Sequence, residues 1–364
     1  MKGPRSVTRR KSAVVFALFL SLTLFLPLAG AFLTGFDLSS LSTFPPEGNF
    51  QGNGGVSIPF TLFAFAVGTT LLLVFILTYI RGYEGRARER NRFPRWGWGG
   101  VLFLLGAWVL AWTRFDWFAP LQRHTFTPLW LGYICVATAL SEKLHGTSPA
   151  REDPLFFISL FPASSLFWWI FEFLNRFVGN WEYRGLGTIT AGEYVALASV
   201  SFSTVLPAVE TTSFLFRGYL GEERVRNSGV VKEAVLPSRR WMTYILLFSG
   251  AVTLFLIPVF PQFLYPFLWI SPVLIVGPLT SIAGLSPDEG DPVIASYGLA
   301  ALVCGFFWET WNWKSLAHWV YHVPLVPSLK LFEMPLPGYF GYLPFGVECF
   351  LFIVLVKYLV RGDL

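Results

Sequence analysis

Four glutamates lie in strongly apolar parts of the chain, where a carboxylate has to be protonated, paired or open to a polar cavity. They are Glu172, Glu210, Glu309 and Glu348. An ionised, unpaired side chain at the centre of a membrane helix costs about 2.5–3.5 kcal/mol on insertion scales. One reason to place carboxylates there is chemistry, because a carboxyl group that an apolar site keeps protonated can donate a proton at neutral pH. The structural alternative is a hydrogen-bonded clasp between helices.

Two of these glutamates have the same set of neighbours. Each has an asparagine three residues later, on the same helix face, whose amide could donate to the carboxylate. Each also has a Trp-x-Tyr sequence nine or ten residues later. The two sets are Glu172, Asn175, Trp181 and Tyr183, and Glu309, Asn312, Trp319 and Tyr321. We predict that the glutamates are catalytic candidates and that the other six residues are candidates for contact with a substrate.

The other two glutamates follow a proline. Pro207 precedes Glu210 by three residues, and Pro344 precedes Glu348 by four. Proline removes a backbone donor, and membranes tolerate such a break where it lines a cavity or packs on protein. At the rise of an α-helix, both glutamates lie about 10–14 Å from the nearest cation that follows them. We therefore predict that they lie deeper than the other pair and are the stronger acid–base candidates, with the prolines beside a bound substrate.

The composition excludes a water-exposed surface of the ordinary kind. Of 364 residues, 54% are hydrophobic and only 13% are charged, whereas a soluble domain carries about 25% charge. The sequence therefore predicts an all-α, polytopic integral membrane protein. Its net charge of +5 is assigned to loops and does not indicate nucleic acid. The three cysteines stand singly in apolar runs, so we expect reduced thiols, no metal and no cofactor.

Ten segments are apolar and long enough for a membrane-spanning helix, which needs about 20 residues. They cover residues 13–33, 57–80, 98–113, 126–142, 154–178, 193–216, 242–260, 264–284, 293–313 and 339–360. With a cytoplasmic N-terminus, all but six of the 27 Lys and Arg residues fall on the cytoplasmic side. The six exceptions are Arg114, Arg123, Arg176, Arg184, Lys314 and Lys330. The positive-inside rule thus predicts a bacterial inner-membrane protein with both termini cytoplasmic and an uncleaved first helix, although that helix also resembles a signal peptide.

The order of these patterns predicts an internal duplication. Arg95-Trp96 and Arg240-Trp241 open two units, and the Glu–Asn, Trp-x-Tyr and Pro–Glu patterns follow in the same order in both. The expected parts are a two-helix segment with a basic cytoplasmic loop over 1–94, a first four-helix repeat over 95–238 and a second over 239–364. An even number of helices gives the two repeats the same orientation, so an axis along the membrane normal should relate these tandem, parallel repeats.

Two sequences in the second repeat depart from a regular helix. Residues 331–346 hold three prolines and three glycines, which predicts a re-entrant or unwound segment, with a plain outer loop as the alternative. His318 and His322 have the spacing of a metal site on a helix face, but no third ligand is evident. We expect both histidines at the outer rim without a metal.

The pattern Trp-x-Tyr … Pro-x(2,3)-Glu-x(3)-Phe, present twice, resembles the duplicated membrane lycopene cyclase domains of carotenoid-making bacteria and archaea. This resemblance implies an isoprenoid substrate whose double bond is protonated by a carboxylic acid. It extends only to Pro207, Glu210, Pro344 and Glu348. The chain has a single glutamate where the cyclases tend to have a doublet, and its units are larger. The string FEMPLPGYFGYLPFGVE is also similar to strings in bacterial polytopic membrane proteins, which implies no function.

Three functions follow from these features and stay open. The first is a membrane enzyme that acts on an isoprenoid or lipid by carboxylate acid–base chemistry. The second is a proton-coupled transporter with its site between the two repeats, and the third is a non-catalytic membrane scaffold subunit. The expected partners are membrane lipid and a hydrophobic small molecule, and the sequence gives no indication of the oligomeric state.

Overall fold

The computed structural model describes residues 4–46, 55–85, 91–221, 229–326 and 329–362. Within these residues the chain is mostly helical, as the all-α prediction requires. Six of the predicted cytoplasmic cations lie outside the described residues: Lys2, Arg86, Arg88, Arg90, Arg224 and Arg226.

The elements follow the chain in a simple order, with short strands after two of the long helices. The α-helices are α1 (Pro4–Thr34), α2 (Ile58–Gly82), α3 (Arg95–Trp112), α4 (Phe126–His145), α5 (Pro149–Glu152), α6 (Pro154–Val178), α7 (Ala191–Phe202), α8 (Val205–Arg217), α10 (Val230–Val235), α11 (Arg240–Leu256), α12 (Pro261–Leu264), α13 (Ser271–Ile282), α14 (Asp291–Lys314) and α15 (Tyr342–Arg361). The 3-10 helices are η1 (Leu38–Ser42), η2 (Asp116–His124), η3 (Tyr265–Leu268) and η4 (Leu336–Gly341). The strands are β1 (Trp181–Arg184), β2 (His318–Tyr321), β3 (Lys330–Leu331) and β4 (Met334–Pro335).

Among the described residues, six helical stretches are long and apolar enough to cross a membrane, or up to eight if each of two bent pairs is one span. The six are α1, α2, α6, the α7–α8 pair, α14, and α15 together with η4. The bent pairs are α3 with η2, at 106°, and the α12–η3 segment with α13, at 45°. α11 is apolar but shorter, with 17 residues. These helices fit a multi-pass membrane protein, and the number of ten spans stays a prediction.

The predicted sixth span is broken ahead of Pro207. α7 ends at Phe202, and α8 begins three residues later, since proline cannot donate to the helical ladder. The Ser164 hydroxyl of α6 bridges the break: it accepts from the Leu206 N–H at 3.0 Å and donates to the Phe202 carbonyl at 2.6 Å. The backbone groups at this break are therefore satisfied by packing against protein.

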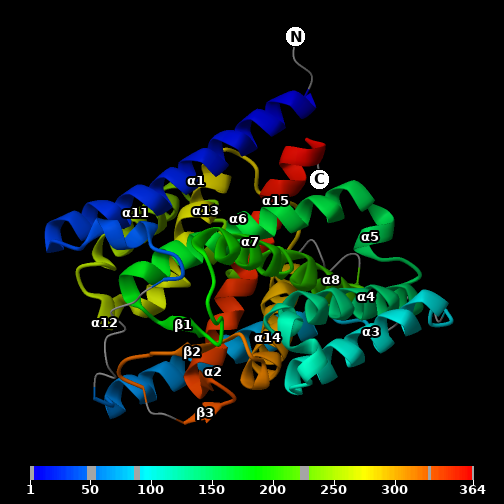
Figure 1. Cartoon of the computed structure of the whole chain (residues 1–364). Coiled ribbons are helices and arrows are strands. Elements are labelled where there is room, and N and C mark those ends of the chain that lie inside the picture. The colour runs from blue at the N-terminus through cyan, green and yellow to red at the C-terminus, as the bar shows by residue number, and fades with distance from the viewer. Residues whose placement is uncertain (1–3, 47–54, 86–90, 222–228, 327–328, 363–364) are drawn as a thin grey trace.

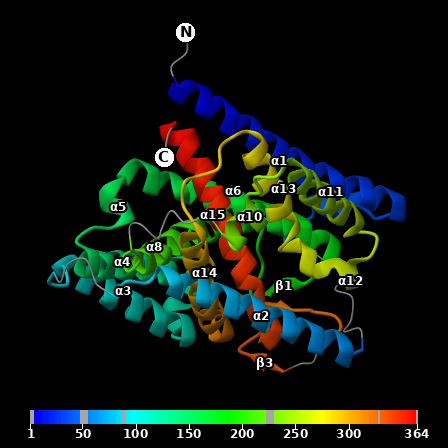
Figure 2. The ribbon, with the colours of Figure 1, turned by 180° about the vertical axis from the view of Figure 1, so that it is seen from behind.

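α14 and α15 run through the middle of the bundle (Figure 1). α14 packs against α15, α8 and α2, and α15 packs against α6, α13 and α1. α1, α11 and α13 lie together on one flank of the bundle, and α3 and α4 lie on the other, in both views (Figures 1 and 2). Both ends of the chain lie on the same side of the bundle, where Arg9 Nη2 donates to the Val360 carbonyl at 2.7 Å.

The structure defines the form of one irregular predicted segment and differs from the prediction for two other elements. The proline- and glycine-rich segment forms the β3–β4 hairpin and η4, because its prolines leave too few N–H groups for an α-helix. The span predicted over 264–284 is regular α-helix only from Ser271 onward. His318 begins the strand β2 and His322 follows it, so their spacing does not place them on a helix face.

Candidate functional site

The two Trp-x-Tyr sequences form one two-stranded ribbon. β1 and β2 pair antiparallel, with Trp181 opposite Tyr321 and Tyr183 opposite Trp319. β1 follows α6 and β2 follows α14, so each strand directly continues the helix that carries its glutamate. After α6 the chain turns at Gly179, whose φ of +62° suits glycine. Two segments far apart in the sequence therefore meet at one place.

Buried asparagines hold each strand against the end of its helix. Asn175 Nδ2 donates to the Trp181 carbonyl at 2.8 Å, and its Oδ1 accepts from the Asn180 N–H at 2.8 Å. Asn312 Nδ2 donates to the Trp319 carbonyl, and its Oδ1 accepts from the Trp319 N–H, both at 2.7 Å. The amides thus bond to backbone groups beyond the helix end and not to the glutamates, which corrects the expected amide–carboxylate contact.

The Glu172 side chain is 3% exposed and is surrounded by aromatic donors. Its Oε1 accepts from the Tyr183 hydroxyl at 2.6 Å and from the indole nitrogens of Trp168 and Trp181 at 3.0 and 3.1 Å. Trp168 lies one turn earlier on the same helix face, and the other two donors come from β1. Three donors therefore compensate for burial of this carboxylate.

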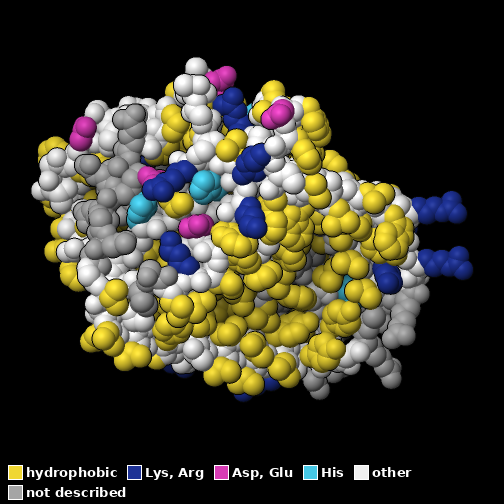
Figure 3. Space-filling view, turned by 60° about the horizontal axis from the view of Figure 1, so that its bottom comes forward, with side chains coloured by type: hydrophobic (Ala, Val, Ile, Leu, Met, Phe, Trp, Pro, Cys, Tyr) yellow, Lys and Arg dark blue, Asp and Glu magenta, His cyan; other side chains and the backbone are white. Residues whose placement is uncertain are grey.

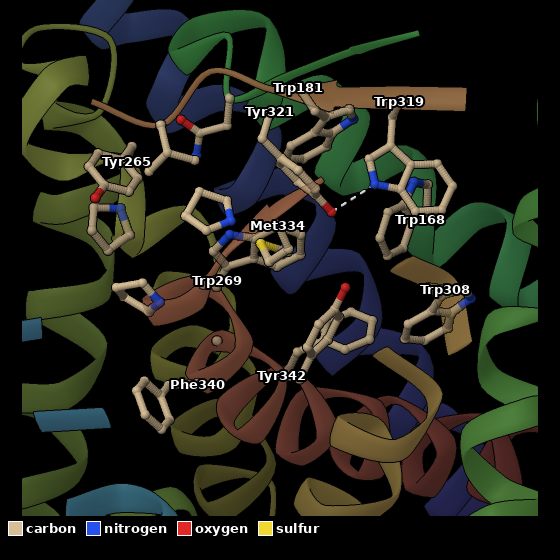
Figure 4. Close-up of a pocket in the computed structure, with 18 of the residues that line it drawn as sticks. Trp168, Trp181, Tyr265, Trp269, Trp308, Trp319, Tyr321, Met334, Phe340 and Tyr342 are labelled. Carbon is tan, nitrogen blue, oxygen red and sulfur yellow. Dashed lines mark hydrogen bonds between the residues drawn. The ribbon is translucent and has the colours of Figure 1, made fainter. Parts of the chain in front are cut away.

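Glu309 is fully buried in an equivalent arrangement on α14. Its Oε1 accepts from the hydroxyls of Tyr321 and Tyr342, at 2.7 and 2.9 Å. The Trp319 indole donates to the Tyr321 hydroxyl at 2.8 Å (Figure 4). A chain of hydrogen bonds thus leads from the indole to the carboxyl group. The second oxygen, Oε2, is buried and has no hydrogen-bond partner among the described residues.

The two arrangements differ one turn before the glutamate. Gly305 lies at the position that Trp168 has in the first set, and a Cβ there would come within 2.4 Å of the Tyr342 ring. The ring of Tyr342, which belongs to α15, thus lies against the glycine and supplies the donor that the tryptophan supplies to Glu172. The absence of a side chain at Gly305 is what admits this ring.

The two strand tyrosines are half-buried and lie beside the carboxylates. Burial raises the pKa of Tyr183 well above its ordinary value, and Glu172 raises it further. Burial likewise raises the pKa of Tyr321, with a further contribution from Glu309. Both phenols therefore stay protonated and act as hydrogen-bond donors to the carboxyl groups.

The rings around both glutamates line a single pocket. Its volume is about 550 Å³, within the range of small-molecule sites. The wall contains both Trp-x-Tyr pairs, the side chains of α2 that face them, and Trp168, Trp269, Trp308 and Tyr342. In the close-up, Tyr321 and Tyr342 reach from opposite sides toward the same point (Figure 4). The space-filling view from this end of the molecule shows a hollow whose walls are hydrophobic (Figure 3).

The pocket presents aromatic faces and phenol hydroxyls. Glu172 and Glu309 lie behind the wall, and the tyrosine hydroxyls stand between the carboxyl groups and the pocket. A hydroxyl both donates and accepts, so it can pass a proton between a molecule in the pocket and the glutamate. The aromatic faces can stabilise a positive charge on that molecule.

The structure places the two proline-linked glutamates elsewhere. Glu210 Oε1 accepts from Arg217 at 2.5 Å, and its Oε2 accepts from the Tyr297 hydroxyl. The buried carboxylate in the middle of α8 is thus paired with a partly exposed arginine at the end of that helix. Glu348 is 1% exposed, and neither of its oxygens has a hydrogen-bond partner among the described residues. The two glutamates share no contact, and neither lines the pocket, although Pro344 does.

The described residues contain no group of three or more His, Cys, Asp or Glu side chains that could hold a metal ion. His318 Nδ1 lies 2.9 Å from the Leu316 carbonyl, and His322 Nε2 lies 3.2 Å from Glu182. The three cysteines, all in the described part of the chain, are free thiols.

Several pocket residues were not found by the sequence analysis. Trp168 could have been found, since it lies four residues before Glu172 on the same helix face. Trp308 directly precedes Glu309 on α14, whereas Trp269 and Tyr342 reach the pocket from two other segments and carry no local signal. Tyr342 is identified only by its contacts with Gly305 and Glu309.

Comparison with known proteins gives no match: no family model, curated protein or solved structure matches the chain significantly. The class of the protein therefore rests on its own features. The described part of the chain is a helical bundle with six to eight long apolar helices, which fits a multi-pass membrane protein. Its most developed site is the aromatic pocket with two buried carboxyl groups.

Proposed function

We propose that this chain is a membrane enzyme that binds an isoprenoid or another lipid-like molecule in the aromatic pocket and acts on it by acid–base chemistry. One observation carries the proposal: two tyrosine–glutamate pairs from distant parts of the chain meet at the wall of one apolar pocket. An apolar wall with few polar groups suits a hydrophobic ligand. A buried carboxyl group reached through a hydroxyl suits proton transfer.

Of the two pairs, Glu309 with Tyr321 is the better proton donor. Glu172 accepts from three donors, and two of them are indoles, which donate but do not accept. Glu309 accepts from two phenol hydroxyls, and its Oε2, which has no hydrogen-bond partner among the described residues, can carry the proton. Glu172 would then hold a negative charge on the other side of the pocket, where it stabilises positive charge on the ligand.

The internal repeat and the topology belong to the same proposal. α3 packs against α4 as α11 packs against α13, and α8 contacts α14 as α15 contacts α6. The register of the ribbon places Trp181 opposite Tyr321 and Tyr183 opposite Trp319, as a two-fold axis between the units requires. These contacts support two tandem, parallel four-helix repeats with the pocket between them. The charge distribution supports a bacterial inner membrane with both termini cytoplasmic.

The test is mass spectrometry of the small molecules that co-purify with the protein in detergent. Wild type would be compared with Glu309→Gln and Tyr321→Phe, which remove the proposed acid and its hydroxyl while keeping the size of each side chain. The matched control is Glu182→Gln in β1. The Glu182 side chain points to the opposite face of the ribbon from Trp181 and Tyr183, pairs with Arg184 at 2.5 Å and does not line the pocket.

We expect a polyprenyl, carotenoid or similar hydrophobic species in the wild type and the control. Glu309→Gln should retain the same class of molecule in a chemically different, unconverted form. Retention of bulk phospholipid alone, identical in all four proteins, would refute the enzyme. Proton-coupled flux by the wild type in liposomes would then test the transporter. Absence of flux in the wild type, together with loss of stability in Glu309→Gln, would indicate the scaffold.

A further inference from the structure

A second hollow lies between α1 and α13. These two helices lie on the same flank of the bundle (Figure 2). Its volume is about 470 Å³, and it shares no residue with the aromatic pocket. Residues of α1 form one wall at helical spacing, and the C-terminal turn of α13 forms the other. The walls include Val7, Arg10, Lys11, Val14 and Leu18 of α1 and Ile282 of α13.

One end of this groove is positively charged. Lys11 Nζ donates to the Ala283 carbonyl at 2.9 Å, which fixes the ammonium group beside the end of α13. Arg10 is exposed and has no hydrogen-bond or ion-pair partner among the described residues. Two cations thus stand at the mouth of the groove, and the acidic side chain that would neutralise Arg10 is missing from its walls.

The rest of the groove is apolar and open to the surroundings. Val14 and Leu18 are 51% and 46% exposed, and Ile282 across the groove is 53% exposed. Arg10 and Leu18 are separated by about 12 Å along the helix axis, so the apolar floor extends well past the cations. Since α1 is one of the apolar helices long enough to cross a membrane, this floor faces hydrocarbon while the cations lie at its edge.

We propose that this groove binds one anionic phospholipid, with its phosphate at Arg10 and Lys11 and an acyl chain along Val14 and Leu18. The charge at the mouth matches an anionic head group, and basic pockets between membrane helices bind such head groups. A free phosphate would use the cations but not the floor, and a neutral lipid would use the floor but leave Arg10 without a counter-charge. The site does not depend on the function of the aromatic pocket.

The test is native mass spectrometry of the full chain in detergent with equal concentrations of phosphatidylglycerol and phosphatidylcholine. Wild type should retain phosphatidylglycerol in preference. Arg10→Gln should weaken its retention about 5-fold and Arg10→Gln/Lys11→Gln about 30-fold, from the contribution of one cation near a lipid head group. The matched control is Arg239→Gln/Arg240→Gln, which removes two exposed cations at the start of α11, outside the groove.

Val14→Trp tests the apolar part, because it fills the floor and keeps both cations. It should weaken phosphatidylglycerol binding and leave any binding of inorganic phosphate unchanged. Equal retention of the two lipids by the wild type would overturn the proposal. It would also be overturned if the α11 control lost as much phosphatidylglycerol retention as Arg10→Gln/Lys11→Gln, because the effect would then come from overall charge. Arg10→Gln removes no hydrogen bond or ion pair within the described residues. Unchanged lipid binding in this variant would therefore overturn the proposal, even if the double variant misfolded.

Discussion

The asparagine that holds the first strand should be among the most costly polar side chains to remove. In Asn175→Ala the Trp181 carbonyl and the Asn180 N–H each lose a bond of 2.8 Å. Asn180 and Trp181 are 3% and 4% exposed, so water cannot replace the amide. A buried polar group left without its partner costs about 1–3 kcal/mol, and two such groups give a loss of about 2–6 kcal/mol in the free energy of unfolding.

The second asparagine gives an internal comparison. Asn312→Ala also removes two bonds, both of 2.7 Å, but Trp319 is only partly buried, so water can reach some of its backbone. We therefore expect a smaller loss, about 1–3 kcal/mol. The assay is reversible unfolding in mixed micelles of a mild detergent and SDS, followed by tryptophan fluorescence, which reports on the rings of the site.

The control for both variants is Thr310→Ala. Thr310 is buried on α14, but its hydroxyl donates only to the Phe306 carbonyl, one turn earlier in the same helix. Its removal should cost less than about 1 kcal/mol, because that carbonyl keeps its place in the helical ladder. If Asn175→Ala lost no more stability than Thr310→Ala, the amide would not hold the strand, and our account of how the tyrosines are positioned would be wrong.

Three further predictions concern packing and pH. Gly305→Ala should displace the Tyr342 ring, because that ring would lie 2.4 Å from the new Cβ. The free energy of unfolding should fall by about 1–3 kcal/mol, and ligand retention should change. Unchanged retention would show that this ring has no role at the site. Gly30→Ala should separate α1 from α11, since the new Cβ would lie 1.9 Å from a backbone carbonyl of α11, and a melting temperature equal to that of wild type would contradict this close packing. Burial raises the pKa of Asp153, but its pairing with Arg361 and with a backbone N–H of α6 lowers it more, so the net pKa is below the ordinary value. The ionised form therefore stabilises the fold at neutral pH, and this stabilisation is lost as the pH falls through the lowered pKa. Asp153→Asn should be less stable than wild type at neutral pH and equal to it in strong acid. Thermal unfolding of both proteins at several pH values is the measurement.

The membrane class of this protein was determined by its sequence. Hydropathy and helix length are local properties, so composition was enough to predict the apolar helices, including α1, α6 and α14, close to their observed positions. The recurrence of Glu-x-x-Asn followed by Trp-x-Tyr also indicated two sets of residues that the structure brings together in one ribbon. Each asparagine acts within its own segment, on the strand that directly follows its helix, so this part of the arrangement is local in sequence.

Only the tertiary structure decided which glutamates stand at a pocket. Depth along a helix favoured Glu210 and Glu348, but depth says nothing of what lies beside a side chain. Arg217 follows Glu210 by two helical turns and reaches back to pair with it, while Tyr342 crosses from α15 to Glu309 over a glycine. Such contacts depend on how the helices pack against one another, and the spacing of residues along one helix does not predict them.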